Sequence, residues 1–571
     1  MAAAKIQRIA QAQQRRAEKQ QRRRLREKKA EAKRRPGRPK QKRYYAKARF
    51  SLKRLSKILN NIEIVISVAL PDTPFTKDPQ RMYSCYRFRP MEIQLHADGA
   101  LKGGILTFVF AWIDWSFVRL LVAPFYKTSG EGGELWDPVT IFLLDLLRVL
   151  LHFSSRDKLL DELRQETPLG RQIATFVGID PSASSGQALD NPKDPAHKVP
   201  SEMAFTHFRN RLTNPLVYEA IFHIMVGLLR QLDIVTFRVL AFDSLLVETW
   251  ATFHGCDNAG QAGHGCEQCL LFKQCERVPY DLEGGVGHRR SKDDPSKVEA
   301  LYCFKVHTGV SFEVALGMEF PVVLLVTPGQ VYDGRYFEAL LEQMERYQGQ
   351  VKAVFHIADG HYDDFKNYIA ARKRGARPIF HYNKRNEKTD PEALDNRGYN
   401  EVGWPYAPCG VLTHPNGYDE DNKRLKFTCG KACPVSHQDC PFRTNQVGYV
   451  KNVPVAENSR LVLEIPRGTR RYKIIFALRS SVERNNDYFA DNGLARPKYY
   501  GLHNMQLNAF LTGIATLLRK LYELIEEASQ QEATPERYPT LDLWGLPLEK
   551  AIRERWKHFH EEDELLAFPD G

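Results

Sequence analysis

This 571-residue chain contains no long, uninterrupted apolar segment. Its most apolar stretch, residues 104–123, is broken by Asp114 and Arg119, which favours a buried helix over a membrane span. The N-terminus also lacks the apolar segment of a secretion signal, because Arg and Gln dominate it. We therefore expect a cytoplasmic protein that does not use a membrane.

Acidic residues are scarce at the N-terminus. Residues 1–50 hold 20 Lys and Arg against 3 Asp and Glu, so this tail more than accounts for the formal net charge of +13. With so few apolar residues the tail should be disordered alone and should bind polyanions through their phosphates. Its segment Arg35-Pro-Gly-Arg38-Pro-Lys40 resembles an AT-hook, in which an extended Gly-Arg-Pro segment lies in a narrow minor groove. The alternative is a basic arm without base preference, and under both interpretations Arg35, Arg38 and Lys40 are candidate DNA contacts.

Cysteine is also scarce, with ten in the chain, but eight of them fall in two clusters. In the reducing compartment expected for a chain without an export signal, clustered thiols favour metal over disulfides. Their spacing predicts a structural Zn²⁺ in each cluster, with reduced thiols or an iron–sulfur cluster as the alternatives. Neither cysteine-rich insertion shows an apolar core, so we expect a metal to let each one fold. The clusters are Cys256, Cys266, Cys269 and Cys275, and Cys409, Cys429, Cys433 and Cys440.

The chain is too long for one compact core, so three or more units are expected. Residues 51–235 have apolar residues at helical spacing. There Phe205 and Phe208 mark a core-facing stripe, while Arg209 and Arg211 point elsewhere, which suits either a DNA-docking domain or a purely structural module. The expected segments are a disordered basic tail (1–50), a helical DNA-binding domain (51–235), the first part of a catalytic core (236–383) with a cysteine-rich insertion (250–290), a second cysteine-rich insertion (384–470), the second part of the core (471–525) and a helical C-terminal tail (526–571).

Two apolar strands each end on a carboxylate. Residues 236–242 are typical of a strand buried on both faces, which delivers Asp243, and residues 351–358 deliver Asp359 in the same way. Burying a charge at the edge of a strand is unfavourable in free energy unless the charge is paired, and a divalent cation is the most favourable partner for a fixed carboxylate. A later segment carries Glu483, and we expect the three carboxylates to meet on Mg²⁺.

From the Asp243 strand onward the pattern gives three strands, a helix, a strand, a helix and a strand. This is the order of an RNase H-like mixed sheet in an α/β catalytic core, which brings the ends of the first and fourth strands side by side. A helix across them would supply the third acid, for which Asp487 is the rival of Glu483. Arg479, four residues before Glu483, would share its helix face and could hold that carboxylate or clamp a phosphate. The acids expected to cap helices instead are Asp333 and one of Asp363 and Asp364.

The motifs around these acids resemble those of the DDE transposases of bacterial insertion sequences, in the broad IS4-like and IS1182-like group. The similarity covers roughly residues 135–525 and implies a helical N-terminal domain before the RNase H-like core. It also implies that Asp243, Asp359 and Glu483 form a catalytic triad that uses Mg²⁺ or Mn²⁺. The matching motifs are Ala241-Phe-Asp243-Ser, Tyr302-Cys-Phe-Lys-Val-His307, Val326-Thr-Pro-Gly-Gln-Val-Tyr-Asp333, Ala358-Asp359-Gly-His-Tyr362-Asp and Arg479-Ser-Ser-Val-Glu483.

The resemblance further implies the partners, which are double-stranded DNA at the transposon ends and at the target, bound by a homodimer in the nucleoid. The family's Tyr-x2-Arg-x3-Glu-x6-Lys signature is met at Arg479 and Glu483, whereas Phe476 and Ala490 replace its Tyr and Lys. Two other functions fit the same residues. One is a catalytically silent DNA-binding protein descended from a transposase, and the other is an RNase H-fold nuclease without strand transfer.

Overall fold

The computed structural model describes the central sheet, the helices around it and most of their connections. The basic tail with Arg35, Arg38 and Lys40 lies outside the described residues, as does the first cysteine cluster. The described residues are 84–88, 102–126, 136–179, 199–212, 216–231, 233–249, 281, 283–290, 297–383, 398–430, 440–442, 448–495, 499–533 and 543–559.

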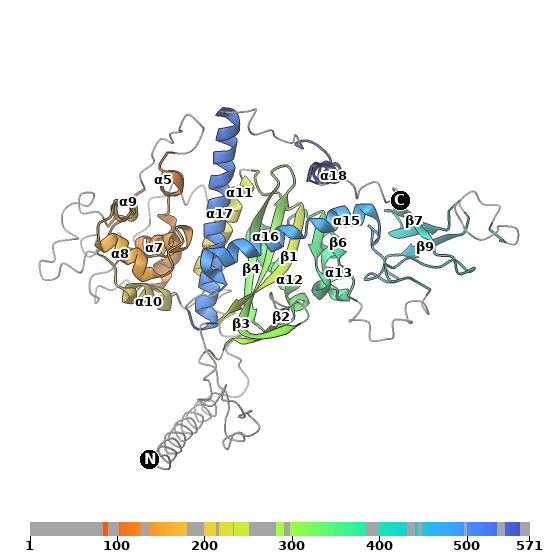
Figure 1. Cartoon of the computed structure of the whole chain (residues 1–571), viewed down its shortest axis with the longest axis horizontal. Helices are drawn as coiled ribbons and strands as arrows, with labels where there is room; N and C mark the ends of the chain where they lie inside the picture. The colour runs from red at the N-terminus through yellow and green to blue at the C-terminus, as the bar shows by residue number, and fades with distance from the viewer. Residues whose placement is uncertain are drawn as a thin grey trace, which may run out of the picture.

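Six strands form a mixed sheet at the centre of the molecule (Figure 1). They are β1 (Val239–Glu248), β2 (Gly285–Arg290), β3 (Val298–Glu313), β4 (Met318–Pro328), β5 (Phe355–Ala358) and β6 (Arg377–Phe380). Strands β4, β3 and β1 are antiparallel neighbours, while β5 and β6 continue from β1 as parallel neighbours. The order β4-β3-β1-β5-β6 is the predicted RNase H-like order, and β2 pairs with the beginning of β3. The α/β fold class is therefore confirmed.

The apolar first half of strand β1 is buried, because helices cover both faces of the sheet there and other strands flank both edges of β1. Residues Val239 to Phe242 have no exposed surface, and β1 lies between β3 and β5. The prediction that this strand ends at Asp243 is wrong, since β1 continues to Glu248. The extension exists because β3 is long enough to pair with β1 as far as Cys303, opposite Glu248.

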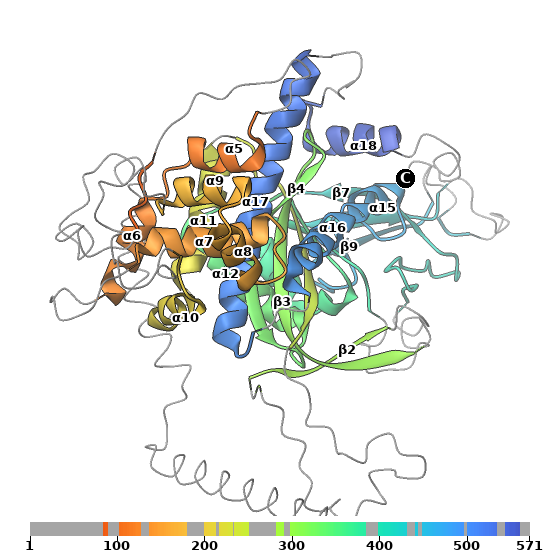
Figure 2. The ribbon, with the colours of Figure 1, turned by 60° about the vertical axis from the view of Figure 1, so that its left-hand side comes forward.

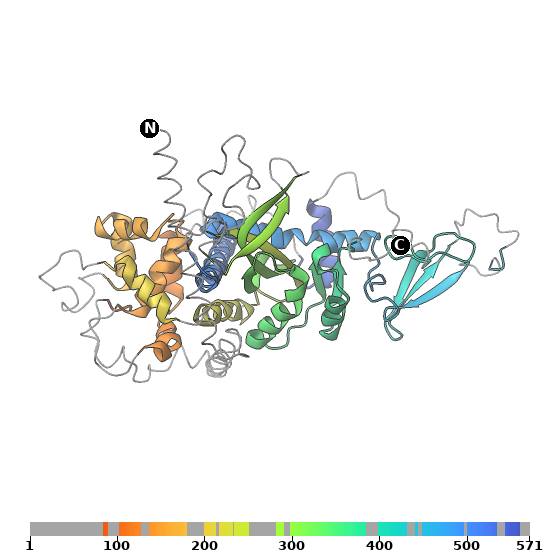
Figure 3. The same cartoon turned by 90° about the horizontal axis from the view of Figure 1, so that it is seen from below.

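Helices cover both faces of the sheet, and Figure 3 shows the sheet between the two sets. On one face α12 (Phe337–Gln348) and α13 (Phe365–Lys373) pack together, and the ring of Phe337 meets Phe242 of β1 edge-on. On the other face lie α16 (Ser480–Phe489) and α17 (Leu502–Ala533), both packed against β3 and β4. The α16 helix also packs against β1, the strand that carries Asp243.

The described part of residues 51–235 is helical, as predicted (Figure 2). Side-chain caps begin two of its helices, at Ser155 and Thr167. Among the described helices, no single one is long and apolar enough to cross a membrane. The helices are α5 (Gly104–Trp112), α6 (Phe117–Val122), α7 (Pro138–Leu150), α8 (Arg156–Arg164), α9 (Pro168–Val177), α10 (Glu202–Arg211) and α11 (Leu216–Gln231).

The second insertion has its own small apolar core, so the expectation that it lacks one is wrong. Its sheet contains β7 (His414–Asp419), β8 (Arg424–Thr428) and β9 (Val450–Pro454). The buried residues alternate along short strands, as with Leu425 and Phe427 of β8, and they meet Val453 of β9 and Leu461 beyond it. This core is hard to see in the sequence because each strand contributes only one or two apolar residues.

Candidate active site

Asp243 and Asp359 lie on neighbouring strands at the centre of the sheet. Phe242 of β1 pairs with Ala358 of β5 in parallel register. Asp243 and Asp359 are the next residues after this pair, so they lie side by side. Neighbouring strands lie about 5 Å apart, which makes these residues neighbours although they are 116 positions apart in the chain. The structure thus brings together the two strand acids that the sequence predicts.

The environment of Asp243 disfavours its charge. Burial and the neighbouring Asp359 carboxylate raise the pKa of Asp243 to about 7, while a hydrogen bond from the backbone N–H of Ser244 to Oδ1, at 2.8 Å, works against this rise. Two carboxylates forced together in this way form a site that a divalent cation would stabilise, because the cation removes their repulsion. The donor set therefore fits Mg²⁺ or Mn²⁺.

Asp359 is held ionised by His361. Burial opposes the charge of Asp359, but His361 outweighs it, and the pKa of Asp359 falls below its ordinary value. The backbone N–H of His361 donates to Oδ1 at 2.9 Å, and its ring Nδ1 lies 2.9 Å from Oδ2. The same hydrogen bond raises the pKa of His361. The two acids thus have pKa values displaced in opposite directions.

Glu483 lies on the first turn of α16 and is joined to the acids through Arg479. The Arg479 Nη2 atom lies 2.7 Å from Glu483 Oε1, the helical contact predicted from their spacing. The positive charge of Arg479 favours the ionised form of both Asp243 and Asp359, although the pKa of Asp243 stays raised. Within the described part of the chain, no three His, Cys, Asp or Glu side chains are close enough to hold one metal ion. In this structure the Glu483 carboxylate pairs with Arg479, and it does not complete a three-carboxylate cluster with Asp243 and Asp359.

Asp333 belongs to the site, although the sequence assigns it to a helix cap. It begins the short 3-10 helix η5 (Asp333–Tyr336) without a capping hydrogen bond from its side chain, so that prediction is wrong. Ser244 donates its hydroxyl to Asp333 Oδ2 at 2.9 Å, and the Lys305 Nζ atom lies 2.7 Å from Oδ1. Lys305 is the available sequence signal, because it is the one Lys or Arg in the β3 strand. Asp364, in contrast, caps α13 as predicted.

Arg209 does not face solvent, so the prediction that it contacts DNA is wrong. Its Nε and Nη2 atoms donate to Oδ2 of the fully buried Asp145 at 2.8 and 2.6 Å. A carboxylate in the core needs such a partner, which explains why an arginine on α10 turns inward. Arg211 is exposed and lies over the ring of Tyr126, and it remains a candidate contact.

The second cysteine cluster gives no support to the zinc prediction. Cys409 is exposed, Cys429 is buried and accepts a hydrogen bond from the backbone N–H of Tyr449, and Cys440 is half-buried. None of these three described thiols is in a disulfide, and none belongs to a metal-binding group among the described residues. Cys433 and the whole first cluster lie outside the described residues.

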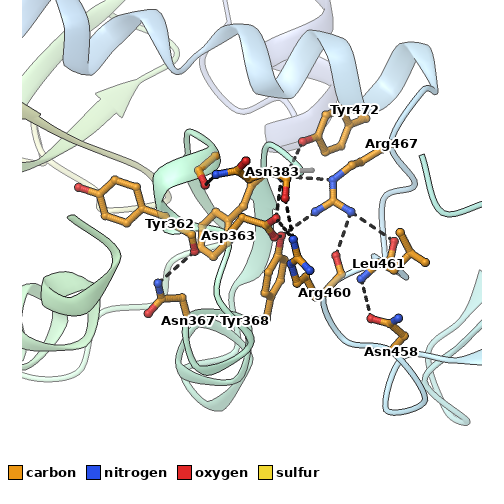
Figure 4. Close-up of polar contacts among 12 residues, drawn as sticks. Tyr362, Asp363, Asn367, Tyr368, Asn383, Asn458, Arg460, Leu461, Arg467 and Tyr472 are labelled. Atoms are coloured by element: carbon orange, nitrogen blue, oxygen red, sulfur yellow. Dashed lines mark hydrogen bonds and ion pairs between the residues drawn. The ribbon is translucent and has the colours of Figure 1, made fainter. Parts of the chain in front are cut away.

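A buried polar network ties the second insertion to the catalytic core (Figure 4). Asp363, four residues after Asp359, accepts hydrogen bonds from Arg460 at 2.8 Å and from the hydroxyl of Tyr368 at 2.6 Å. Arg467 donates to the same Tyr368 hydroxyl at 2.6 Å and to the carbonyl of Phe380 in β6 at 3.1 Å. This network fixes the segment that leads into α15 (Arg470–Ala477) and then α16, the helix that carries Glu483.

The sheet order and the paired acids define an RNase H-like core with an acidic site on its central strands. Residues 285–518 match the family model described as the transposase DDE domain. The match shows what this part of the chain is similar to, and it includes Asp359 and Glu483 but begins after Asp243. Residues 285–518 are thus similar to a transposase DDE domain, while transposition by the whole chain and its insertion-sequence group stay predictions.

Two further comparisons add little to this assignment. Among solved structures, the piggyBac transposase synaptic complex with hairpin DNA shares a TM-score of 0.29 and 10% identity with the chain, covering 79% of this chain and 78% of that one. A likeness this distant carries no argument about function. The comparison with curated proteins gives no match.

Proposed function

We infer that this transposase cuts DNA at the ends of an insertion sequence and joins the freed 3′ end to target DNA. The observation that carries the proposal is the pairing of Asp243 and Asp359 on neighbouring strands beneath α16, within or next to the matched domain. Carboxylates arranged in this way are used for transfer at phosphodiesters. The partners proposed with it are double-stranded DNA at both ends and at the target, bound by a homodimer in the nucleoid.

Asp243, Asp359 and Glu483 would hold Mg²⁺ or Mn²⁺, which activates the attacking oxygen and stabilises the leaving one. Asp243 accepts this role readily because its pKa near 7 reflects burial of its charge and repulsion from Asp359, and a bound cation offsets both. Glu483 takes part once it leaves Arg479, whose guanidinium prefers a phosphate to an exposed carboxylate when DNA is bound. Arg479 therefore has two roles, holding Glu483 in the free protein and contacting the DNA backbone in the complex.

The test is a cleavage assay on DNA that spans the borders of the element encoding this chain, with Mg²⁺ or Mn²⁺ in the buffer. Asp243→Asn, Asp359→Asn and Glu483→Gln should each lose about 10³-fold or more in rate while they keep the fold. The matched control is Asp487→Asn, an exposed acid one turn after Glu483 on α16. Full activity in any of the three variants would overturn the assignment of that residue.

The same substrates separate the alternative functions. A transposase joins a pre-cut end to a second duplex, whereas a nuclease of the same fold releases cut DNA without joining it. A silent descendant binds the border DNA and shows no metal-dependent cleavage. Zinc in the first cysteine cluster remains a proposal, which metal analysis of the purified chain tests.

A further inference from the structure

A two-stranded ribbon extends the sheet beyond the active site. Pairing between β1 and β3 ends where Glu248 meets Cys303, but β3 begins at Val298 and pairs there with β2 alone. Figure 2 shows this ribbon at the lower edge of the sheet. Asp243 pairs with Thr308, ten residues after Val298, so the ribbon reaches about 33 Å from the catalytic carboxylate. That length corresponds to about ten base pairs of duplex DNA.

The face of the ribbon that continues from Asp243 is exposed. Side chains alternate along a strand, and directly paired residues share a face, so Ala300 and Val298 lie on the side of Thr308 and Asp243. Their partners include His288, which pairs with Ala300 and is exposed. Val298 is 68% exposed, and Val286, on the same face opposite Tyr302, is 41% exposed.

The acids of the ribbon lie on the opposite face. Glu299 alternates with Ala300, and its carboxylate pairs with Arg289 at 3.1 Å. Arg289 also lies 3.5 Å from Glu248, which alternation places on that same far face. Among the described positions of β2 and of residues 298–302, no acid falls on the Asp243 face. Within these described positions the near face carries no carboxylate, and the carboxylates on the far face are paired with a cation.

We propose that the near face of this ribbon, formed by Val286, His288, Val298 and Ala300, binds the duplex that flanks the scissile phosphate. A two-stranded β-ribbon fits the major groove, and small side chains such as Ala300 let it approach the DNA closely. The absence of acids on this face complements the phosphates, and the face continues from the paired catalytic acids. The proposal rests on the proposed function, because it takes DNA as the substrate.

The direct test is photocrosslinking in the full-length chain carrying Asp243→Asn, which separates binding from cleavage. A benzophenone amino acid is placed at position 288 on the near face or at the neighbouring position 289 on the far face. The probe is border DNA labelled at one end. Position 288 pairs with Ala300, eight residues before Thr308, so it should crosslink about eight base pairs from the cleavage position, and position 289 should give little or no product.

Two results would overturn the proposal. One is equal crosslinking at both positions, or none at position 288 while the chain still binds the duplex. The other is a crosslink from position 288 to a second copy of the chain, which would make the face a protein interface. Loss of cleavage in the acid variants is a separate readout, so a failed function and a failed binding surface are distinguishable.

An affinity measurement supports the crosslinking with charge-matched variants. His288→Glu and Arg289→Gln each lower the net charge by about one, but they do so on opposite faces of the same strand. His288→Glu should weaken binding to border DNA about tenfold at fixed salt with competitor DNA present, and Arg289→Gln should change it less than about twofold. Equal effects of the two substitutions would show that charge alone is measured and would overturn the assignment of the face.

Discussion

Several side chains of this protein have partners far away in the chain, and their roles follow from those partners. Arg209 binds Asp145 from 64 positions away, and Asp333 accepts a hydrogen bond from Ser244 across 89 positions. Local sequence rules assign such residues to a surface or a cap, because those rules see only neighbours within a few positions. Asp243 and Asp359 were easier to predict, since each comes directly after a run of apolar residues that itself signals a buried strand.

The first residue-scale prediction concerns Glu219, which is buried on α11. Burial raises its pKa from 4.5 to about 7, so the folded protein keeps this proton at a pH where the unfolded chain has lost it. The free energy of unfolding should therefore fall as pH rises from about 4.5 to about 7, with the loss complete above that range. Glu219→Gln should be more stable than the parent at pH 8 by about 2–3 kcal/mol, and equal to it near pH 4.

Urea unfolding across this pH range measures the Glu219 effect. The control is Glu202→Gln, which removes an exposed carboxylate from the first turn of α10 and should leave the pH dependence unchanged. A variant at position 219 with the same pH profile as the parent would contradict the prediction.

A second residue-scale prediction compares the two arginines of α10. Arg209→Ala should lower the free energy of unfolding by about 3–5 kcal/mol, because it leaves the buried Asp145 with weaker partners. Arg211→Ala removes an exposed cation over Tyr126 and should cost less than about 1 kcal/mol. Thermal or urea unfolding distinguishes them, and equal losses would mean that Arg209 is not the main partner of Asp145.

At the scale of elements, the strand order could be predicted because apolar runs of strand length alternate with helical spacing. The β7–β9 sheet could not, because residues such as Leu425 and Val453 are isolated in the sequence and become a core only after three short strands pair. The position of α16 over β1 also depends on tertiary packing. It needs the network around Arg467, whose partners include backbone carbonyls that leave no mark in the sequence.

Arg467→Met should loosen this element-scale connection. The buried guanidinium donates to the carbonyls of Phe380 and Arg460, so its loss should cost about 2–3 kcal/mol locally. Hydrogen exchange should accelerate in α15 and in the segment from residue 458 to 469, with a lower cleavage rate because Glu483 is less well placed. Arg471→Met, which removes an exposed pair with Glu549, is the control. Unchanged exchange in α15 would show that the network does not hold it.

At the scale of the whole molecule, the N-terminal helices and the sheet share one apolar core. A single cluster of buried residues runs from Tyr86 through α7 and α11 to the sheet and to α18 (Leu548–Phe559). The 32-residue helix α17 lies between them, packed against α7 and α11 as well as β4. The β7–β9 sheet has a separate cluster.

This division predicts two unfolding units. The N-terminal helices and the sheet should unfold together, since separating them would expose their shared core, and the β7–β9 unit should exchange its amide hydrogens at lower free energy. Hydrogen exchange followed by mass spectrometry across a urea series measures both. Separate transitions for α7 and for β4 would contradict the shared core.

The shared core also limits how the protein can move. Because α17 is packed against α7, α11 and β4, the N-terminal helices cannot move away from the central sheet without exposing the apolar core that they share with it. Within the described residues, we expect any such movement in the parts outside that core, which are the β2–β3 ribbon and the β7–β9 sheet.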